Sequence, residues 1–294
     1  MRMLILGHGY SAGALTPRLR AAGWDVTGTT RGNGARVAAA GADPLIWDGT
    51  ATGPGADALR DAIAGADAVI QSIAPGDGGD PVLAGFADDI AAARPGWIGY
   101  LSTTAVYGDH AGGWVDEDAP PTPATGRGAA RLRAEQGWAA LAERTGAPLH
   151  VFRLAGIYGP GRGPFEKLRR GTARRIIKPG QVFSRIHVDD IAGAVMAALD
   201  HGGADGGIWN VCDDDPAPPE DVIAHAAGLI GLPVPPPEDF DSAEMTPMAR
   251  SFYGESKRVS NARIKDRLGW QPAYPDYRRG LAAILAAETQ TAGQ

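Results

Sequence analysis

The sequence predicts an α/β protein with a doubly wound parallel sheet. Through about residue 155, short apolar runs alternate with longer alanine-rich stretches. Each run is too short for a buried helix and is closed by Gly, Pro, Asp or Thr, which favours buried parallel strands. In such a sheet the ligand site lies beyond the carboxyl ends of the strands. The predicted strands are residues 3–7, 25–30, 44–47, 68–74, 97–103 and 148–155.

The stretches between these strands are rich in strong helix formers and end near glycine, as crossover helices do. They cover residues 12–23, 56–66, 82–96 and 129–147. Beyond residue 160 the pattern loosens into strand-like segments at 182–188 and 207–213, a helix at 189–203, and a closing helical pair at 259–270 and 274–288. We expect residues 1–160 to form the sheet domain. Residues 161–294 should form mainly a small cap, with some segments returning to the sheet.

Composition excludes several classes of protein. The 294 residues carry a formal net charge of −6, which supplies no general field for nucleic acid or an anionic membrane, so neither is an expected partner. No run approaches the roughly 18 apolar residues of a membrane-spanning helix. The single cysteine, Cys212, cannot form an internal disulfide. We therefore expect a cytoplasmic protein.

A glycine-rich turn, GHGYSA, follows the first predicted strand and opens a helix-like stretch. Gly7, Gly9 and Ala12 have the GxGxxG/A spacing, in which Gly7 permits a tight turn and Gly9 lets the backbone approach a pyrophosphate. Tyr10 and Ser11 lie between them at the helix N-terminus, where backbone N–H groups favour anions. The motif predicts a dinucleotide cofactor, the alternative being a purely structural glycine turn.

The end of the second predicted strand indicates which dinucleotide binds. NAD-binding proteins usually carry an acid there that accepts hydrogen bonds from the ribose 2′-hydroxyl. Here the residues are Thr29, Thr30 and Arg31, and the next acid is Asp43. Hydroxyls and a guanidinium suit a 2′-phosphate better than a free ribose. We expect NADP(H) in preference to NAD(H), the alternative for Arg31 being an exposed surface residue.

Five further segments extend the pattern over nearly the whole chain: LSTTAVYG (101–108), RLAGIYGPG (153–161), RIHVDDIAGA (185–194), WNVCDDDPAP (209–218) and RLGWQPAYPDYRRGL (267–281). With the glycine turn, they resemble the extended short-chain dehydrogenase/reductases, specifically the NAD-dependent epimerase/dehydratase-like group. The resemblance implies a Rossmann-type, NADP(H)-binding domain over residues 1–160 and a substrate-binding cap over 161–294. It also implies a small-molecule substrate, and homodimers are usual in the group.

The resemblance assigns roles by position. Asp48, after the third strand, would meet the adenine, and Ser72 and Ala74 would line the cofactor ribose. Ile157, in the turn after the sixth strand, would lie beside the nicotinamide. Thr103 matches the catalytic hydroxyl that bonds the reacting oxygen of the substrate; the alternative is a β-branched residue that ends a strand.

The catalytic Tyr–Lys pair of the group is missing. Counting back from Glu135 in RGAARLRAE, which resembles YxxxKxxxE, its two positions hold Arg127 and Arg131. Arg131 could still offer a cation to the nicotinamide ribose. Arg127 cannot donate a proton, because guanidinium does not deprotonate in proteins. The chain therefore resembles atypical members that have lost the pair.

Acid–base chemistry then requires another residue. Tyr107 and Tyr158 are the phenols that the motifs place nearest the cofactor, with packing as the alternative role for both. A YxxxK spacing also occurs at Tyr253 and Lys257, but it lies in the cap sequence, and we interpret it as chance spacing.

Several residues differ from those usual in the group, and these differences limit the classes of substrate that we expect. Thr104 and Ala105 stand where dehydratases carry an acidic pair, so the acid that expels water is absent. Gly156 and Phe183 replace an asparagine and an arginine of sugar-nucleotide epimerases, which disfavours a nucleotide-diphosphate sugar. The basic segment 167–178 would either hold a substrate anion or form a solvated helix end. His187 and the acids at 213–215 lack metal-ligand spacing, so no metal is expected.

Two functions of different classes remain open. One is an NAD(P)(H)-dependent oxidoreductase or epimerase-like enzyme that acts on a small polar carbonyl, alcohol or sugar-like substrate. The other is a non-catalytic NADP(H)-binding sensor or regulatory protein, suggested by the loss of both Tyr and Lys. The fold does not choose between them, because function resides in the site.

Overall fold

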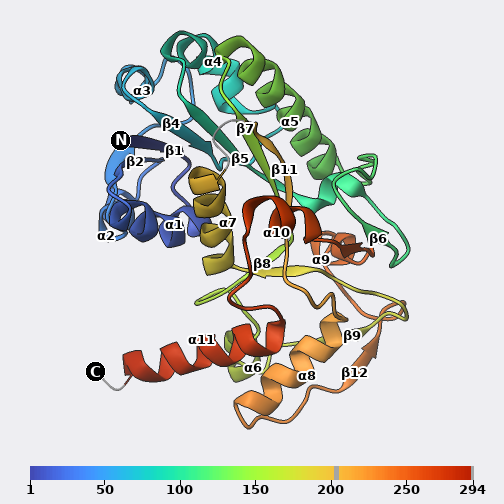
Figure 1. Ribbon diagram of the computed structural model, residues 1–294. Coiled ribbons are helices and arrows are strands. Elements are labelled where there is room, and N and C mark those ends of the chain that lie inside the picture. Colours follow the sequence, from blue (N-terminus) through green and yellow to red (C-terminus); the bar gives the residue numbers. More distant parts are fainter. Residues whose placement is uncertain (202–204, 293–294) are drawn as a thin grey trace.

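A seven-stranded parallel sheet forms the centre of the computed structural model, which describes residues 1–201 and 205–292 (Figure 1). The strand order is β11-β7-β5-β4-β1-β2-β3, so the winding reverses between β1 and β4. This order confirms the predicted doubly wound α/β fold. The strands are β1 (Arg2–Leu6), β2 (Asp25–Thr30), β3 (Asp43–Ile46), β4 (Ala68–Gln71), β5 (Trp97–Thr103), β7 (Leu149–Leu154) and β11 (Gly207–Val211).

All six predicted strands are present, and β11 returns to the sheet from the C-terminal half of the chain to pair with β7. The fourth strand ends at Gln71, three residues before the predicted end at Ala74. The Gln71 side chain accepts a hydrogen bond from the Ile73 backbone N–H at 3.2 Å, which turns the chain out of the sheet. The residues after Gln71 therefore form a loop at the carboxyl ends of the sheet strands.

Helices cover both faces of the sheet (Figure 1). On one face α1 (Tyr10–Ala21) packs against α7 (Val188–His201), and together with the sheet they enclose one apolar core. The other face carries α3 (Ala56–Ala64), α4 (Pro81–Ala93) and α5 (Gly126–Thr145) over a second core. The short α2 (Gly34–Ala39) follows β2. The last two residues of the helix predicted at 189–203 lie outside the described residues.

Capping side chains set where the helices begin. Asp80 accepts a hydrogen bond from the Val82 backbone N–H at 2.8 Å, with Pro81 at the first helical position of α4. Thr125 accepts one from Gly128 N–H at 3.1 Å and starts α5 three residues earlier than predicted. The earlier start matters for the site, because it brings Arg127 onto the helix one turn before Arg131.

The cap lies below the sheet in Figure 1 and has its own apolar cluster, built around α6, α8 and α11. Three short parallel strand pairs lie outside the large sheet: β8 with β10, β9 with β12 and β6 with β13. The remaining elements are η1 (Thr104–Tyr107), β6 (Trp114–Val115), β8 (Gly156–Tyr158), α6 (Phe165–Arg169), β9 (Arg175–Ile177), β10 (Arg185–His187), α8 (Pro219–Leu229), β12 (Pro237–Asp239), α9 (Pro247–Phe252), β13 (Arg258–Val259), α10 (Ala262–Leu268) and α11 (Tyr277–Ala292).

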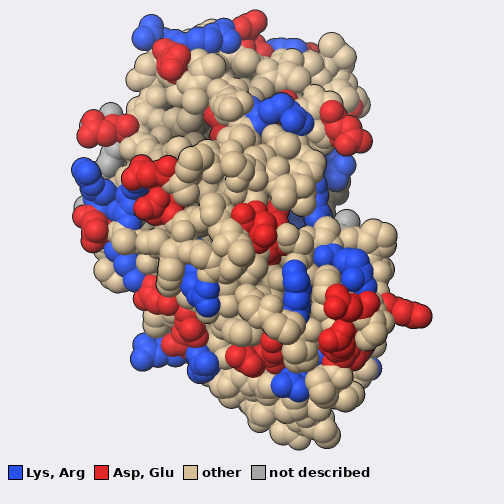
Figure 2. Space-filling view, turned by 90° about the vertical axis from the view of Figure 1, so that its right-hand side faces the viewer, with Lys and Arg blue, Asp and Glu red and all other residues tan. Residues whose placement is uncertain are grey.

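The surface carries charges of both signs. On the face shown in Figure 2, lysine and arginine side chains are interspersed with aspartate and glutamate rather than gathered in one patch. Among residues 1–201 and 205–292, none of the helices combines the length and the apolar character needed to cross a membrane.

A buried histidine makes the fold sensitive to acid. The His150 ring, on β7, stacks between the indoles of Trp97 and Trp209, with ring centroids 5.3 and 6.0 Å away. Its Nδ1 accepts a hydrogen bond from Trp209 Nε1 at 3.0 Å. Burial lowers the pKa of His150 to about 4. The folded protein therefore holds this ring neutral.

We predict that acidification from pH 6.5 to pH 4 lowers the free energy of unfolding through His150. In that interval the unfolded chain binds a proton that the folded chain excludes, which costs the folded state about 3 kcal/mol. His150→Gln keeps an acceptor for Trp209 but does not titrate, so its unfolding free energy should fall less. Urea denaturation at pH 7 and pH 4.5 measures both. Identical losses in the two proteins would show that His150 does not carry the effect.

Candidate functional site

One large cavity, of about 1440 Å³, lies at the carboxyl ends of the sheet strands and extends to the cap. Its walls include the glycine turn after β1, the loops after β2, β4, β5 and β7, and the start of α5. On the cap side it is bounded by residues 182–185 and by residues 251–259. The strand-end loops meet there as the parallel sheet requires.

The two glycines of the turn have different structural roles. Gly7 has φ +88°, and a Cβ on it would lie 2.6 Å from Ile73 Cγ1, so both its backbone and its surroundings require glycine. Gly9 is the N-cap of α1 and provides no side-chain cap, and a Cβ on it would meet only Gly7 O, at 4.0 Å. The space before the first turn of α1 is therefore open. Ala12 is buried beneath it.

This open space fits a pyrophosphate. The first backbone N–H groups of a helix have no partners within the helix, and the helix N-terminus carries partial positive charge. Here Gly9, Tyr10 and Ser11 line the cavity at that end. The Tyr10 hydroxyl donates to Pro160 O at 2.9 Å and joins the turn to the loop after β8.

Two arginines line the cavity at the end of β2. Thr29 is buried and its Oγ1 accepts from Gly7 N at 2.7 Å, so it holds the glycine turn. Thr30 and Arg31 follow at the cavity wall. Arg36, from α2, also lines the cavity and donates from Nη2 to His8 O at 2.9 Å. Arg36 could not be assigned from the sequence, because no motif marks its position.

The other residues assigned to the cofactor also line this cavity: Asp48, Ser72, Ala74, Arg131 and Ile157. The Asp48 carboxylate accepts from the backbone N–H of Thr50 at 2.8 Å, which fixes the loop after β3. The Ser72 backbone N–H donates to Leu6 O at 2.8 Å and keeps the loop after β4 beside β1. The structure thus brings these residues together at one site.

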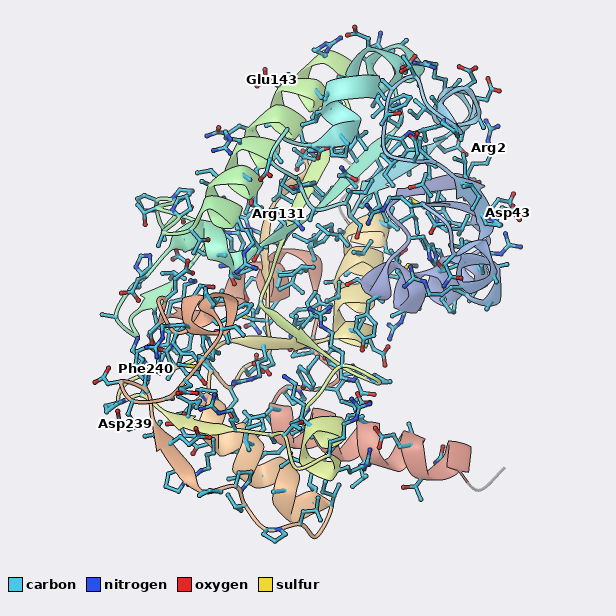
Figure 3. All side chains as sticks on the ribbon, turned by 180° about the vertical axis from the view of Figure 1, so that it is seen from behind. Arg2, Asp43, Arg131, Glu143, Asp239 and Phe240 are labelled. Carbon is cyan, nitrogen blue, oxygen red and sulfur yellow. The ribbon has the colours of Figure 1, made fainter. Side chains whose placement is uncertain are left out.

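Thr103 lies at the cavity wall with its hydroxyl proton available. Its Oγ1 accepts a hydrogen bond from Ala105 N–H at 3.2 Å, and its side chain caps η1. A hydroxyl that accepts in this way still has its own O–H to donate. Across the strand end, Arg131 Nη1 donates to Leu101 O at 2.5 Å. Figure 3 shows Arg131 on the inner side of α5, whereas Glu143 on the same helix points outward.

The two candidate phenols are not available to a substrate. Tyr107 is fully buried, does not line the cavity, and donates to Asn210 Oδ1 at 2.8 Å. Burial raises its pKa to about 12. Tyr158 reaches the cavity wall, but its buried hydroxyl faces α11, since a Cβ on Gly280 would lie 2.1 Å from it. Burial, with the nearby Asp213 carboxyl, raises the Tyr158 pKa further. We retain neither residue as a proton donor.

Comparison with known proteins identifies the family. The model of the NAD dependent epimerase/dehydratase family matches residues 87–212. Protein YeeZ of Escherichia coli strain K12 is 31% identical over 290 residues, with 94% of this chain and 97% of that protein covered. The chain belongs to the NAD-dependent epimerase/dehydratase family. Within it the chain is an atypical short-chain dehydrogenase/reductase, because Arg127 and Arg131 stand where the Tyr–Lys pair is usual.

Two further proteins are similar to this chain. A solved structure of a functionally unknown conserved protein from Silicibacter pomeroyi is 54% identical, has a TM-score of 0.87, and covers 98% of this chain and 99% of that chain. A 3-diazoavenalumate denitrifying reductase from a Streptomyces species is 31% identical over 185 residues, covering 57% of this chain and 58% of the reductase.

The YxxxK spacing in the cap forms no catalytic pair of the family type. Tyr253 follows α9 and packs on the rings of Phe183 and Phe240, and the residues between it and Lys257 are not helical. Lys257 nevertheless reaches the cavity. Its buried Nζ donates to Gly108 O at 2.6 Å and to the Glu255 carboxylate at 2.7 Å. This placement could not be predicted from the sequence, because the contact with Gly108 spans 149 residues.

A buried ion pair supports the cavity wall. Arg153 of β7 donates from Nη2 to Glu135 of α5 at 2.8 Å, and both side chains are almost fully buried. Ser102 of β5 donates to the same carboxylate at 2.5 Å. Burial opposes the charge on Arg153, but hydrogen bonding and attraction to Glu135 raise its pKa overall. Glu135, which the sequence marks only as the acid of the YxxxKxxxE-like segment, therefore joins α5 to β5 and β7.

The basic segment 167–178 is largely engaged elsewhere. Arg169 pairs with Glu288 at 2.5 Å, and Arg174 pairs with Glu238. Lys178 donates to Tyr253 O. None of the segment's residues lines the large cavity, which favours the surface interpretation. Within the part of the chain that the structure describes, no three His, Cys, Asp or Glu side chains gather as a metal site would require.

Substitutions at the two glycines should separate folding from cofactor binding. Gly7→Ala places a side chain in a left-handed backbone conformation against Ile73, so we expect a loss of about 1–3 kcal/mol in unfolding free energy. Gly9→Val should fold normally, since its φ is −94° and the space is open, but it should lose most dinucleotide affinity.

Thermal unfolding and NADPH calorimetry on both variants give the two readouts. Undiminished NADPH binding by Gly9→Val would remove the glycine turn from the cofactor site.

Proposed function

We propose that the protein is an NADP(H)-dependent oxidoreductase that acts on a small polar carbonyl or alcohol. The single observation that carries the proposal is the continuity of one cavity from the glycine turn to Thr103 and Arg131. A dinucleotide needs the first part of that space, and a substrate beside its reactive ring needs the second. The family's NAD(P)-binding fold supports oxidoreductase or epimerase activity.

Different residues along the cavity would bind different parts of the cofactor and the substrate. Gly9, Tyr10 and Ser11 would hold the pyrophosphate at the start of α1. Arg131 would supply a cation near the nicotinamide ribose, and Ile157 an apolar wall. The bound cofactor would supply or accept hydride at the nicotinamide. Thr103 would donate its free O–H to the substrate oxygen, a hydrogen bond that strengthens as negative charge develops there.

The choice of NADP(H) rests on Arg31 and Arg36. Both arginines line the cavity, Arg31 directly after β2 and Arg36 on α2, and no carboxylate stands at the end of β2 to accept from a ribose 2′-hydroxyl. A 2′-phosphate would gain charge-assisted hydrogen bonds from either arginine. NAD(H) has no 2′-phosphate and would offer neither arginine an anion at this position.

A non-catalytic NADP(H) sensor is the second candidate, favoured by the burial of Tyr107 and of the Tyr158 hydroxyl. The enzyme is preferred, because the Thr103 O–H remains available at the cavity and because a related protein is a reductase by name. A screen of carbonyl compounds and alcohols that follows NADPH absorbance tests the choice. Saturating NADPH binding without turnover of any compound would favour the sensor.

The Arg31→Ala variant should weaken NADPH binding while leaving NADH binding nearly unchanged. Loss of a charge-assisted phosphate contact costs about 1.5–3 kcal/mol, or roughly a tenfold to hundredfold loss of affinity. Arg133→Ala is a matched control, because Arg133 is exposed and lies outside the cavity. Calorimetric titration with both cofactors measures the effect. Equal losses for NADPH and NADH would make Arg31 a structural residue.

Thr103→Val should lower kcat without lowering NADPH affinity. Valine keeps the β-branched shape that suits the end of β5 but removes the hydroxyl donor. Losing one such donor typically costs 10²- to 10³-fold in rate at oxyanion sites, so we expect a decrease of about that size. Steady-state kinetics on the best substrate of the screen, with NADPH titration in parallel, provides the measurement. Normal turnover by Thr103→Val would overturn the assignment.

A further inference from the structure

The cavity is strongly basic although the protein as a whole is acidic. The chain has a formal net charge of −6. Among the residues that the structure describes, only two carboxylates, Asp48 and Glu255, line the cavity. Its cationic lining residues are far more numerous: Arg31, Arg36, Arg127, Arg131, Arg162, Arg185 and Lys257. Such a concentration of one sign in a cleft attracts ligands of the opposite sign.

Apart from Lys257, these cations form no ion pair with a described carboxylate, unlike many arginines elsewhere in the described structure. Across residues 1–201 and 205–292, Lys257 is the one cation of the cavity that forms an ion pair, with Glu255 at 2.7 Å. Surface arginines, by contrast, are commonly paired, as Arg144 is with Asp88 at 2.6 Å and Arg20 with Asp25 at 3.0 Å. The positive charge of the cavity is therefore left for a ligand to neutralise.

The cofactor accounts for only part of this charge. In the proposed function Arg31 and Arg36 meet the 2′-phosphate, and the start of α1 meets the pyrophosphate. Arg127 and Arg185 line the cavity on the side of α5 and of the cap residues 182–185. Arg185 forms no ion pair with Asp213; its Nη1 donates to the backbone carbonyls of Phe183 and Ala217 at 2.9 Å, and burial raises the pKa of the Asp213 carboxyl. The substrate half of the cavity thus keeps its positive charge.

Arg127 is the cation best placed to bind a ligand group. It is exposed on the first turn of α5, one helical turn before Arg131, and it lines the cavity. Its guanidinium lies 5.4 Å from the centre of the Phe252 ring, and Nη2 donates to Ser251 Oγ at 3.3 Å. A guanidinium has five N–H donors in a planar fork that matches an oxyanion, and this one bond leaves the fork available.

We propose that the substrate carries an oxyanion, a carboxylate or a phosphate, and that Arg127 binds it in the basic half of the cavity. The inference rests on the oxidoreductase function proposed above, since it specifies the substrate class of the same cavity. The residue that replaces the family's tyrosine becomes a substrate-binding group. Arg185 adds to the field that draws the anion in, whereas the charge of Lys257 is balanced by Glu255.

Anion binding can be tested without turnover. Protein saturated with NADPH is titrated at constant ionic strength with succinate, inorganic phosphate or the uncharged succinamide, and thermal unfolding is followed. Succinate or phosphate should raise the melting temperature, since a ligand of the folded state stabilises it, whereas succinamide should not. Which of the two acts distinguishes a carboxylate from a phosphate site.

Matched variants assign that effect to Arg127. Arg127→Met should abolish the anion-dependent rise in melting temperature, and Arg133→Met, an exposed arginine of the same helix outside the cavity, should keep it. Arg127→Gln is the second variant if the methionine protein does not fold. The absence of any anion effect in the wild type, or an effect that survives loss of Arg127, would overturn the proposal.

Turnover gives the second readout. NADPH oxidation is compared for succinic semialdehyde against butanal, and for glyceraldehyde 3-phosphate against glyceraldehyde. One charged aldehyde should exceed its uncharged counterpart by roughly tenfold or more in kcat/KM, and Arg127→Met should reduce that ratio toward one. Turnover of uncharged compounds with no dependence on Arg127 would leave the oxidoreductase standing and overturn the anion site. Anion binding without hydride transfer to any compound would support the anion site and overturn the oxidoreductase function.

Discussion

The buried ion pair between Glu135 and Arg153 holds the site together. It joins α5 to β7, and the Ser102 hydroxyl adds β5 to the same carboxylate. A buried charge that loses its partner costs about 3–5 kcal/mol, so the three elements are held in one arrangement. That arrangement brings the end of β5, with Thr103, beside the first turns of α5, with Arg127 and Arg131.

The parallel sheet and the cap supply the rest of the cavity. Because all strands of the sheet point the same way, the glycine turn, the arginines after β2 and the hydroxyl after β5 meet at one edge. The cap closes this edge with an extended segment in which Glu255, Lys257 and Val259 line the cavity at every second residue. Ser256, between them, bonds instead to the loops at 109–112 and 180–182.

The sequence predicted best those features that depend on residues close together in the chain. The strand and helix periods predicted the sheet, and the GxGxxA spacing predicted a turn whose Gly7 does have a positive φ. The direction in which a side chain points was harder to predict from the sequence. Tyr107 follows Thr103 by only four residues, yet the short η1 helix sends it into the core while Thr103 stays at the cavity. The short distance in sequence between Tyr107 and Thr103 does not show that the chain turns between them.

The sequence also did not predict which residues from distant parts of the chain reach the site. Arg36 lies on a helix too short to give a periodic signal, and Lys257 reaches the site only because its segment bonds to a loop far away in sequence. The excess of cations in the cavity follows from which arginines find carboxylates in three dimensions. Composition reports only the net charge of −6, which has the opposite sign.

The central claim is that one cavity holds NADP(H) and a substrate, with the 2′-phosphate near Arg31 and the nicotinamide near Thr103. A crystal structure of the protein with NADPH tests it most directly. The account predicts the pyrophosphate at the Gly9 end of α1, the 2′-phosphate bonded to Arg31 or Arg36, and the nicotinamide ring beside Thr103 and Arg131. NADPH bound with its nicotinamide outside this cavity, or with the 2′-phosphate away from both arginines, would contradict it.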